Sequence, residues 1–199
     1  GTVFIHQQMS FIKNKDLHVN TDNVIVFPAW KIYKHVKEFK NDLQQSSHIS
    51  QITAANMSFF EGSNSTTDLE WPGKQKDQEL AIAQIDVDQN FLAFFQTTLK
   101  EGTDFSKSTA NAPDYILNET AVRKMGLKNP VGQPIKFHDR EGIVIGVVKD
   151  FHYKSLQKEI EPALLEYAPD DGAVIYARMQ QENVKEVIAY AQNTWKKYE

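Results

Sequence analysis

Two neighbouring stretches carry the clearest local structure in the chain: YILNETAVRKMGLKNPVGQPIKF at residues 115–137 and EGIVIGVVKDFHYKSL at residues 141–156. The first predicts a short strand over Tyr115–Leu117. Asn118 follows as the expected N-cap of a helix, because its side chain can accept hydrogen bonds from the free amides of the first turn. The helix over Glu119–Met125 should end at Gly126, which adopts the left-handed conformation without a Cβ clash.

The rest of this region predicts a turn and two strands. Residues 129–132 (NPVG) match a type I turn, with asparagine first, proline second and glycine fourth. Strands are expected over Pro134–His138 and Gly142–Lys149, joined by a turn at Asp139–Glu141. The second strand is apolar on both faces, which is typical of a central strand. Gly146 within it indicates a bulge or a close approach of another backbone.

Before this region, the chain predicts a β-α-β unit. A strand over Asn23–Pro28 precedes a helix over Trp30–Gln45, and a second strand follows over Ile49–Phe60. The helix has an apolar stripe at helical spacing, and its lysines fall mostly on the solvent side. The stripe consists of Ile32, Val36, Phe39 and Leu43, and the lysines are Lys31, Lys34, Lys37 and Lys40.

The middle of the chain predicts a strand-rich segment. A polar loop at Glu61–Asp68 leads into a hairpin that pairs Leu69–Trp71 with Leu80–Val87. A helix is expected over Asp88–Leu99. Five aromatic residues could line an apolar cleft here, although core packing is favoured. They are Phe59, Phe60, Phe91, Phe94 and Phe95.

The end of the chain predicts a second β-α unit. After a connection over Phe151–Glu161, Ala163–Tyr167 and Ala173–Met179 are expected as strands, and Asn183 caps a last helix over Val184–Tyr198. The two strands are the nearest candidates to complete the sheet of the first β-α-β unit, since two strands cannot bury a helix well.

These elements predict three parts. Residues 1–22 form a membrane-proximal helical segment, residues 23–60 and 160–199 form one lobe, and residues 61–159 form a lobe inserted into it. The chain would cross between the lobes near residues 61–63 and near residues 151–162. Two crossings of this kind permit hinge motion.

The composition narrows the class of function. The 199 residues include no cysteine, which excludes a disulfide framework, a thiolate zinc site and a cysteine nucleophile. The net charge is −4 without a block of like charges, so nucleic acid is not an expected partner. No apolar run approaches the ~18 residues of a membrane-spanning helix. Because the first residue is Gly1 rather than methionine, we expect a soluble piece of a larger protein.

Motifs for catalysis or cofactor binding are missing from the sequence. The six histidines form no HExxH motif, and no GxxxxGK[ST] loop is present to bind ATP. Asp86 and Asp88 share a strand face that could suit acid–base chemistry, but a solvated strand end is favoured. The run Lys149–Tyr153 is interpreted as a charged turn leaving a central strand. We therefore predict no catalytic residue, cofactor or metal.

The quoted stretches resemble the MacB-like periplasmic core domain of FtsX-family ABC transporter permeases. That family shows a strand, then NE.A...+G..NPIG, then G.IVGVV.DF...SL...I.P, and the order and spacing agree. The segment QQ..FI.NKDL...T.NVIV is similar to permeases of the Bacteroidetes type. Val131 departs from the pattern, since isoleucine is commoner there. The motif residues are Asn118, Glu119, Gly126, Asn129, Pro130, Gly132, Gly146, Asp150, Phe151 and Pro162.

The resemblance implies an α+β fold with a porter-like lobe made from both chain ends and an inserted, sabre-like lobe. It implies a domain on the periplasmic side of the bacterial inner membrane. There it would couple cytoplasmic ATP hydrolysis to conformational change, for export or extraction of a client. The implied partners are a second permease copy and a cytoplasmic ABC ATPase, and a periplasmic adaptor is left open. The client stays unidentified.

A different class of function is left as an alternative, a free-standing periplasmic domain that binds peptides or acts as a sensor. An enzyme is not expected. For the isolated chain we predict no ATP hydrolysis, because a phosphate-binding loop is missing, and a monomer or weak dimer, because a permease dimer would associate largely through its membrane helices.

Overall fold

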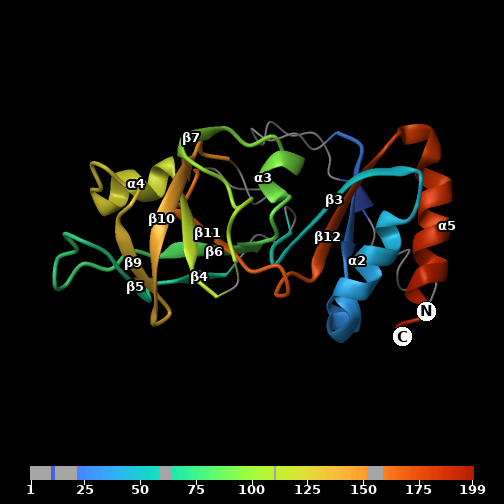
Figure 1. Ribbon diagram of the computed structural model, residues 1–199, viewed down its shortest axis with the longest axis horizontal. Helices are drawn as coiled ribbons and strands as arrows, with labels where there is room; N and C mark the ends of the chain where they lie inside the picture. Colours follow the sequence, from blue (N-terminus) through green and yellow to red (C-terminus); the bar gives the residue numbers. More distant parts are fainter. Residues whose placement is uncertain (1–9, 12–21, 59–63, 110, 152–158) are drawn as a thin grey trace.

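The computed structural model describes residues 10–11, 22–58, 64–109, 111–151 and 159–199. Its strands form one mixed sheet along the long axis of an elongated molecule (Figure 1). The mixture of helices with parallel and antiparallel strands confirms the predicted α+β class. The strands fall into two groups, called here the first lobe and the second lobe.

The first lobe is an antiparallel group built from both ends of the chain. Its strands are, in order, β1 (Ser10–Phe11), β2 (Val24–Pro28), β12 (Val174–Met179) and β3 (Ile49–Ala55). Its helical elements are η1 (Trp30–His35), α2 (Val36–Gln44), η2 (Gln181–Asn183) and α5 (Val184–Trp195). Buried side chains of α2 and α5 pack on one face of β2, β12 and β3, with the rings of Phe39 and Trp195 in edge-to-face contact at 5.4 Å.

The second lobe is a mixed group of strands. Its order is β6 (Ile82–Val87), β11 (Ala163–Tyr167), β8 (Asp114–Asn118), β10 (Arg140–Val148), β9 (Pro134–Phe137) and β5 (Leu69–Glu70), with β4 (Ser65–Thr66) beside β6 and β7 (Leu99–Gly102) beside β10. The β6–β11 and β8–β10 pairs are parallel. The helix α4 (Glu119–Met125) follows β8, and its Ala121 and Met125 pack into the core of this lobe.

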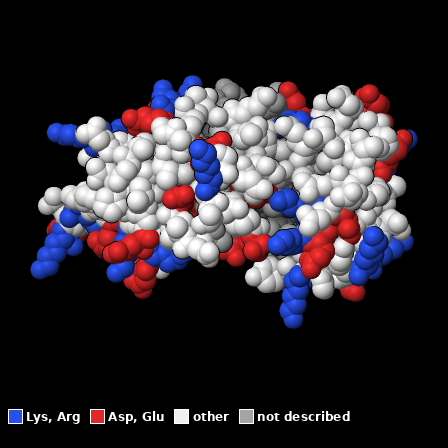
Figure 2. Space-filling view, in the orientation of Figure 1, with Lys and Arg blue, Asp and Glu red and all other residues white. Residues whose placement is uncertain are grey.

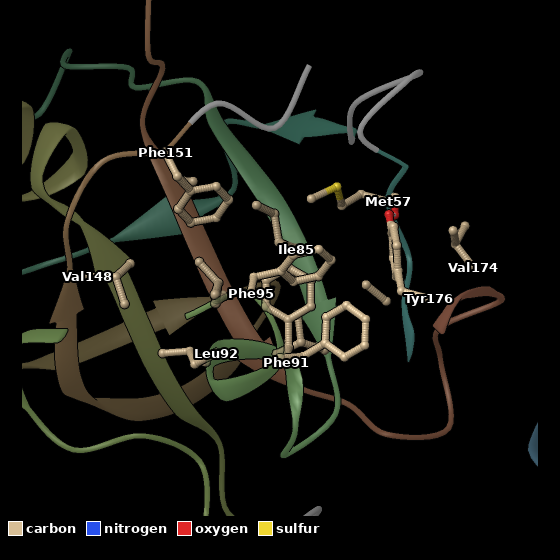
Figure 3. Packing of buried hydrophobic residues seen from close by; sticks show 14 of the residues in the cluster. Met57, Ile85, Phe91, Leu92, Phe95, Val148, Phe151, Val174 and Tyr176 are labelled. Carbon is tan, nitrogen blue, oxygen red and sulfur yellow. The ribbon is translucent and has the colours of Figure 1, made fainter. Parts of the chain in front are cut away.

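The two lobes meet at one ladder contact and at a shared core. Among the described residues, β3 and β6 pair in register through Ala55 and Val87. The short helix α3 (Phe91–Phe94) lies at this junction (Figure 1). Figure 3 shows the core around it, where Phe95 meets Tyr176 of the first lobe edge to face at 5.2 Å, and Ile85 and Val148 come from the second lobe. The lobes therefore share buried apolar surface.

The prediction for Ala163–Tyr167 is wrong. This segment is β11, which lies in the second lobe between β6 and β8 and does not pair with the strands of residues 23–60. The parallel pairing with β6 buries Ala163, Leu164 and Leu165 completely, which an edge position would not do. The strand predicted over Ala173–Met179 is confirmed as β12, between β2 and β3. The second crossing between lobes thus falls after β11, and not within residues 151–162.

The helical segment predicted for residues 1–22 lies mostly outside the described residues. Ser10 and Phe11 are the described part of its expected helix, and they form β1, paired antiparallel with Val26 and Ile25 of β2. At these two positions the helical prediction is wrong, because the backbone joins the free edge of β2.

The hairpin predicted between Leu69–Trp71 and Leu80–Val87 is also wrong. β5 was expected to pair with β6, but it pairs with β9. The strand that pairs with β6 instead is β4. Trp71 helps to hold β5 at the far edge of the sheet, because its buried indole Nε1 donates a hydrogen bond to the Met125 carbonyl at 2.9 Å.

Three predicted helices differ from the structure in their details. The helix expected over Trp30–Gln45 is split into η1 and α2, and η1 is kinked at the buried Ile32, whose backbone angles are not helical. The helix expected over Asp88–Leu99 is only the single turn α3, which ends where Gln96 has a φ of 51°. Asn183 makes no side-chain cap, since η2 precedes α5.

The two predicted turns are each shifted. The amide of Gln133 donates to the carbonyl of Pro130 at 3.1 Å, so this turn starts one residue later than expected. Gly132 then stands third with a φ of 93°, as a type II turn requires. The β9–β10 hairpin turns at His138 and Asp139, whose φ values of 49° and 62° are those of a type I′ turn.

The predicted cap at the end of α4 is confirmed. Gly126 has a φ of 70°, and its amide donates to the Arg123 carbonyl at 3.1 Å. The amide of Leu127 donates to the Val122 carbonyl at 3.2 Å, which completes the paired hydrogen bonds of a Schellman motif. Val122 and Leu127 both pack against the core of the second lobe.

Replacing Gly126 with valine should lower the free energy of unfolding by about 1–2 kcal/mol, because a side chain at positive φ crowds its own backbone. A Cβ placed at Gly126 meets no atom within 4 Å, so the cost is conformational and not a clash. Gly126→Asn is the matched control and should cost less, since asparagine tolerates this conformation. Urea unfolding measures both variants. An unchanged midpoint for Gly126→Val would argue against the left-handed cap.

Candidate functional site

The motif residue Asn118 lies where β8, α4 and β11 meet. Its side chain is buried, and Oδ1 accepts hydrogen bonds from the amides of Ala121 and Ala163, both at 2.9 Å. Its Nδ2 donates to the Glu161 carbonyl at 2.8 Å. The predicted N-cap of α4 is therefore confirmed. The side-chain amide of Asn118 also holds the N-terminal end of β11 in place, through Glu161 and Ala163. The sequence did not indicate this second role.

Glu119 and Asp150 accept hydrogen bonds that connect the start of α4 with the residues after β10, beside Asn118. Glu119 Oε1 accepts from the amide of Asp150 at 3.0 Å. The Asp150 carboxylate accepts from the amide of Thr120 at 2.9 Å and from the Thr120 hydroxyl at 2.7 Å. These carboxylates lie at the start of α4, where backbone amides lack helical partners. Their hydrogen bonds connect the C-terminal end of β10 to the start of α4.

Phe151 and Pro162 complete this arrangement, called here the motif junction. Phe151 is buried in the core shared by the lobes (Figure 3), and the Pro162 carbonyl accepts from the amide of Ala83 at 2.9 Å. The motif junction thus anchors both ends of the connection from β10 to β11. Residues 152–158 of that connection lie outside the described residues.

The remaining motif residues lie apart from the motif junction. Gly126 ends α4, and Asn129, Pro130 and Gly132 follow in the connection to β9. Gly146 lies in β10 opposite Gly102 of β7, where a Cβ on Gly146 would be 2.6 Å from the Thr103 carbonyl oxygen. The β8–β10 register also shifts beside Gly146, so the predicted bulge and close approach are confirmed.

The motif junction has the geometry of a structural clamp. Glu119 Oε1 and both carboxylate oxygens of Asp150 accept from backbone and hydroxyl donors. Of the run Lys149–Tyr153, the last two residues lie outside the described part of the chain. Within the described ranges, no three histidine, cysteine or acidic side chains are grouped to hold a metal ion. Nor does any helix of that part have the length and apolarity to cross a membrane.

A buried ion pair crosses from the first lobe to the second at the lobe junction. Lys40 Nζ of α2 lies 2.7 Å from Asp88 Oδ2, and the side chains are 16% and 1% exposed. Asp88 also accepts from the Thr53 hydroxyl at 2.5 Å and from the amides of Ala54 at 2.9 Å and Asn90 at 3.0 Å. The predicted solvated strand end is therefore wrong for Asp88. Lys40 is the exception among the lysines expected mostly on the solvent side, since Lys31, Lys34 and Lys37 are exposed.

Arg178 makes a second connection across the lobe junction. It lies on β12 of the first lobe, and its guanidinium donates to the carbonyl of Phe94 in α3 at 2.6 Å. The guanidinium carbon also lies 4.7 Å from the centre of the Phe94 ring, within the range of a cation–π contact. On the same strand, the Tyr176 hydroxyl donates to the Met57 carbonyl. The helix α3 is thus held to β12 by polar and apolar contacts.

Two further buried carboxylates face each other in the second lobe. Asp86 of β6 and Glu166 of β11 are register partners on parallel strands. Glu166 forms an ion pair with Arg140, while Asp86 accepts from Gln84 Nε2 at 3.1 Å and from Asn56 Nδ2 at 3.3 Å. The solvated interpretation of Asp86 is wrong as well. The sequence did contain a signal for this burial, because Glu166 lies inside the apolar strand ALLEY (residues 163–167), where a carboxylate needs a buried partner.

Burial dominates the titration of this pair. It raises the pKa of Asp86 above its ordinary range, although the hydrogen bond from Gln84 opposes the shift. It also raises the pKa of Glu166, against the opposing charge of Arg140. Burial further raises the pKa of Tyr115 to about 12, so its hydroxyl is a neutral donor to the Arg140 carbonyl at 2.9 Å.

Acidification should therefore stabilise the fold through Asp86. A raised pKa in the folded state means that the folded protein binds more protons than the unfolded chain between the two pKa values, so stability falls as pH rises through that window. We expect Asp86→Asn to remove part of the stability that the wild type gains as the pH falls from neutral to below the ordinary pKa of an aspartate, as measured by thermal midpoints. Asp104→Asn is the control of opposite sign, because hydrogen bonds from Ser106 lower the pKa of Asp104. Identical pH profiles for wild type and Asp86→Asn would contradict the prediction.

A polar groove of 530 Å³ opens beside the Lys40–Asp88 pair, between α2 and the connection from β11 to β12. Tyr33, Lys34 and Lys37 line one wall, and Asp170 lies on the other. Of the aromatic residues that could have lined an apolar cleft, the three that the structure describes do not line this groove. Phe91, Phe94 and Phe95 are buried, which confirms core packing for these three, whereas Phe59 and Phe60 lie outside the described residues.

Comparison with known proteins gives one family and a consistent fold. The model of the MacB-like periplasmic core domain matches residues 4–193. The periplasmic region of MacB from Actinobacillus actinomycetemcomitans is similar in structure, with a TM-score of 0.56 and 17% identity over 76% of this chain and 70% of that one. The extracellular domain of the noncanonic ABC-type transporter YknZ from Gram-positive bacteria has a TM-score of 0.60 and 14% identity, over 82% and 84% of the two chains.

A domain assigned to a permease protein from Porphyromonas gingivalis gives a TM-score of 0.57 with 16% identity, over 80% of this chain and 76% of that one. No curated protein sequence matches the chain. At these identities the solved structures establish a common fold. The family match, which covers nearly the whole chain, goes beyond fold.

Proposed function

The chain belongs to the family of MacB-like periplasmic core domains, and on that premise we propose that it transmits motion as the extracytoplasmic domain of an ABC transporter permease. The family is one of permeases that work with an ATPase. In the proposed mechanism, ATP hydrolysis by a cytoplasmic ABC ATPase moves this domain on the periplasmic side of a bacterial inner membrane. We further propose that two copies of the permease form a dimer of the FtsX type and that the protein comes from a Bacteroidetes-like source. Its client and its adaptor are still to be identified.

We assign the first lobe as porter-like and the second as sabre-like. Residues 1–22 are the proposed membrane-proximal segment, and residues 23–60 remain with the porter-like lobe. The boundary expected at residue 160 moves to the end of β11 at Tyr167, because β11 pairs with β6 and β8.

The lobe junction is the observation that carries the proposal. Bending between the lobes would expose apolar surface around α3, at about 25 cal/mol for each Å², and would separate Lys40 from the buried Asp88. Separating a buried ion pair leaves an uncompensated charge, which is costly. The contacts between the lobes therefore favour a lever in which both lobes move together as one rigid body. They disfavour the hinge motion that was predicted from the two chain crossings.

The alternative of a free-standing peptide-binding or sensor domain has less support. It depended on an apolar cleft, and the three phenylalanines described there are packed in the core. The groove beside α2 is polar and open, so any peptide bound there would be recognised mainly through charge.

Distance measurements in the intact permease with its ATPase test the lever. The domain has no cysteine, so spin labels can be placed at Lys37→Cys in the first lobe and Lys124→Cys in the second, both exposed. Between nucleotide-free and ATP-bound states we expect an unchanged distance between the two labels of one copy. The distance between the Lys124→Cys labels of the two copies should change.

The result separates the mechanisms. A nucleotide-dependent change in the distance between the two labels of one copy would show that the lobes bend relative to each other and do not move as one rigid body. If neither distance responds to nucleotide, motion is not transmitted to this domain and the proposed function fails. Copies carrying both labels, diluted with unlabelled copies, provide the control that isolates the distance within one copy.

A further inference from the structure

The short helix η1 exposes two aromatic side chains. Trp30 is 48% and Tyr33 is 59% exposed, whereas the other two tryptophans, Trp71 and Trp195, are buried. Single exposed apolar residues are ordinary on a protein surface. Two large aromatic rings exposed within four residues of sequence instead offer apolar surface that a partner can cover.

Trp30 and Tyr33 lie three residues apart in η1, and Lys31 and Lys34 follow them directly in sequence. The backbone is kinked between the two rings at Ile32, whose φ of −108° and ψ of 35° are not helical. Ile32 is buried at 3% exposure and anchors the element to the first lobe. The outward surface of η1 therefore combines two rings with lysines on a fixed support.

Lysines predominate in the segment itself, and acidic residues lie beside it. Residues 29–37 (AWKIYKHVK) contain three lysines and no acidic residue, whereas Glu38 and Asp170 line the neighbouring groove and Glu199 interacts with the charge of Lys31. Lys37 lies 3.8 Å from Asp170, but both side chains are at least 70% exposed, so this pair holds the lysine weakly. Figure 2 shows lysine or arginine side chains projecting around the end of the molecule where Figure 1 places α2, with acidic side chains among them.

The position of η1 follows from its neighbours. The ring of His35 stacks on Tyr198 with centroids 5.5 Å apart, and the Tyr190 hydroxyl donates to the Asp42 carbonyl at 2.7 Å. The surface thus lies beside the C-terminal end of α5. In the proposed permease, the segments that flank this domain lead to membrane helices. This step of the argument rests on the proposed function.

We propose that Trp30 and Tyr33, with Lys31, Lys34 and Lys37, form a surface that binds the anionic headgroup layer of a membrane. Tryptophan and tyrosine favour the membrane–water interface, because their rings are apolar bodies with one polar group. Lysines near an anionic surface add an attraction that salt screens. The surface holds the first lobe against the membrane and gives the lever a fixed base.

Vesicle binding by this chain tests the proposal directly. The probe is a vesicle of phosphatidylglycerol and phosphatidylcholine in equal parts, compared with phosphatidylcholine alone. Tryptophan fluorescence should shift to shorter wavelength on the anionic vesicles, and brominated lipid should quench it. Trp30 is the exposed tryptophan, so Trp30→Phe should remove most of both signals while cosedimentation shows that binding is retained.

Charge variants identify the surface. Replacing Lys31, Lys34 and Lys37 with glutamine should weaken partitioning roughly a hundredfold, from about fivefold for each lysine. The matched control replaces three exposed lysines of the second lobe, Lys100→Gln, Lys107→Gln and Lys124→Gln, and should weaken it far less. Raising the salt concentration should weaken the wild type and leave the first variant almost unaffected.

Three outcomes overturn the proposal. Wild-type protein that does not partition onto anionic vesicles refutes it, and so does an equal loss in both triple variants. Self-association through Trp30 without lipid, detected by sedimentation, would assign the surface to a second copy instead. None of these outcomes bears on the nucleotide-dependent distances in the intact permease, so the proposed function can stand if this inference fails.

Discussion

Replacing Asp88 with alanine should lower the free energy of unfolding by about 3 kcal/mol, the lower end of the range for breaking a buried ion pair. The variant leaves Lys40 without its partner, and Lys40 is 16% exposed, so its ammonium can reach water only in part. It also removes the acceptor of three donors, the Thr53 hydroxyl and the amides of Ala54 and Asn90. Urea unfolding measures the loss.

The Lys37–Asp170 pair provides the matched control for this experiment. It joins an α2 lysine to an aspartate across the same groove, but at 3.8 Å and with both side chains at least 70% exposed. Lys37→Ala should therefore change the free energy of unfolding by less than about 0.5 kcal/mol. A loss below about 1 kcal/mol for Asp88→Ala would show that the pair does not hold the lobes together.

Asn118→Ala should cost about 3 kcal/mol. The helix cap contributes about 1 kcal/mol. The buried amide of Ala163 and the carbonyl of Glu161 then lose their partner, and each unsatisfied buried group costs about 1–3 kcal/mol before relaxation. Thermal and urea unfolding should both report the loss, because the side chain fixes the start of β11 inside the sheet of the second lobe.

Asn129→Ala is the corresponding control in the same motif. Asn129 is exposed, whereas Asn118 is buried. We expect a change within about 0.5 kcal/mol for the control. Comparable losses for the two variants would mean that the motif acts through local turn formation and not through the motif junction.

Local patterns predicted the second lobe's helix and its caps well. The interactions of Asn118 with Ala121 and of Gly126 with Arg123 span only three residues, so the chain itself brings the partners together. Gly146 was also recognised, because a glycine inside an apolar strand often marks a bulge or a close backbone approach. Asn183 shows the limit of this reasoning, since the preceding turn η2 left its side chain no capping role.

Strand partners could not be predicted in the same way. The segment Ala163–Tyr167 was recognised as extended, but its assignment to the first lobe was wrong, because a strand that is apolar on both faces fits any central position. Likewise, Leu69–Glu70 pairs with β9 and not with the strand that follows it in sequence. Proximity in sequence favoured the wrong partner in each case.

The sequence by itself determined the elements of the second lobe from β8 to β10, the cap at Gly126 and, through its motif residues, the family. Tertiary structure alone decided the position of β11, the motif junction and the burial of Lys40 against Asp88, which lie 48 residues apart. The physical reason is that strand pairing and the burial of charge depend on which surfaces meet. A carboxylate such as Asp88 is stable inside the protein only when packing brings it a lysine and three hydrogen-bond donors, and no local pattern records that meeting.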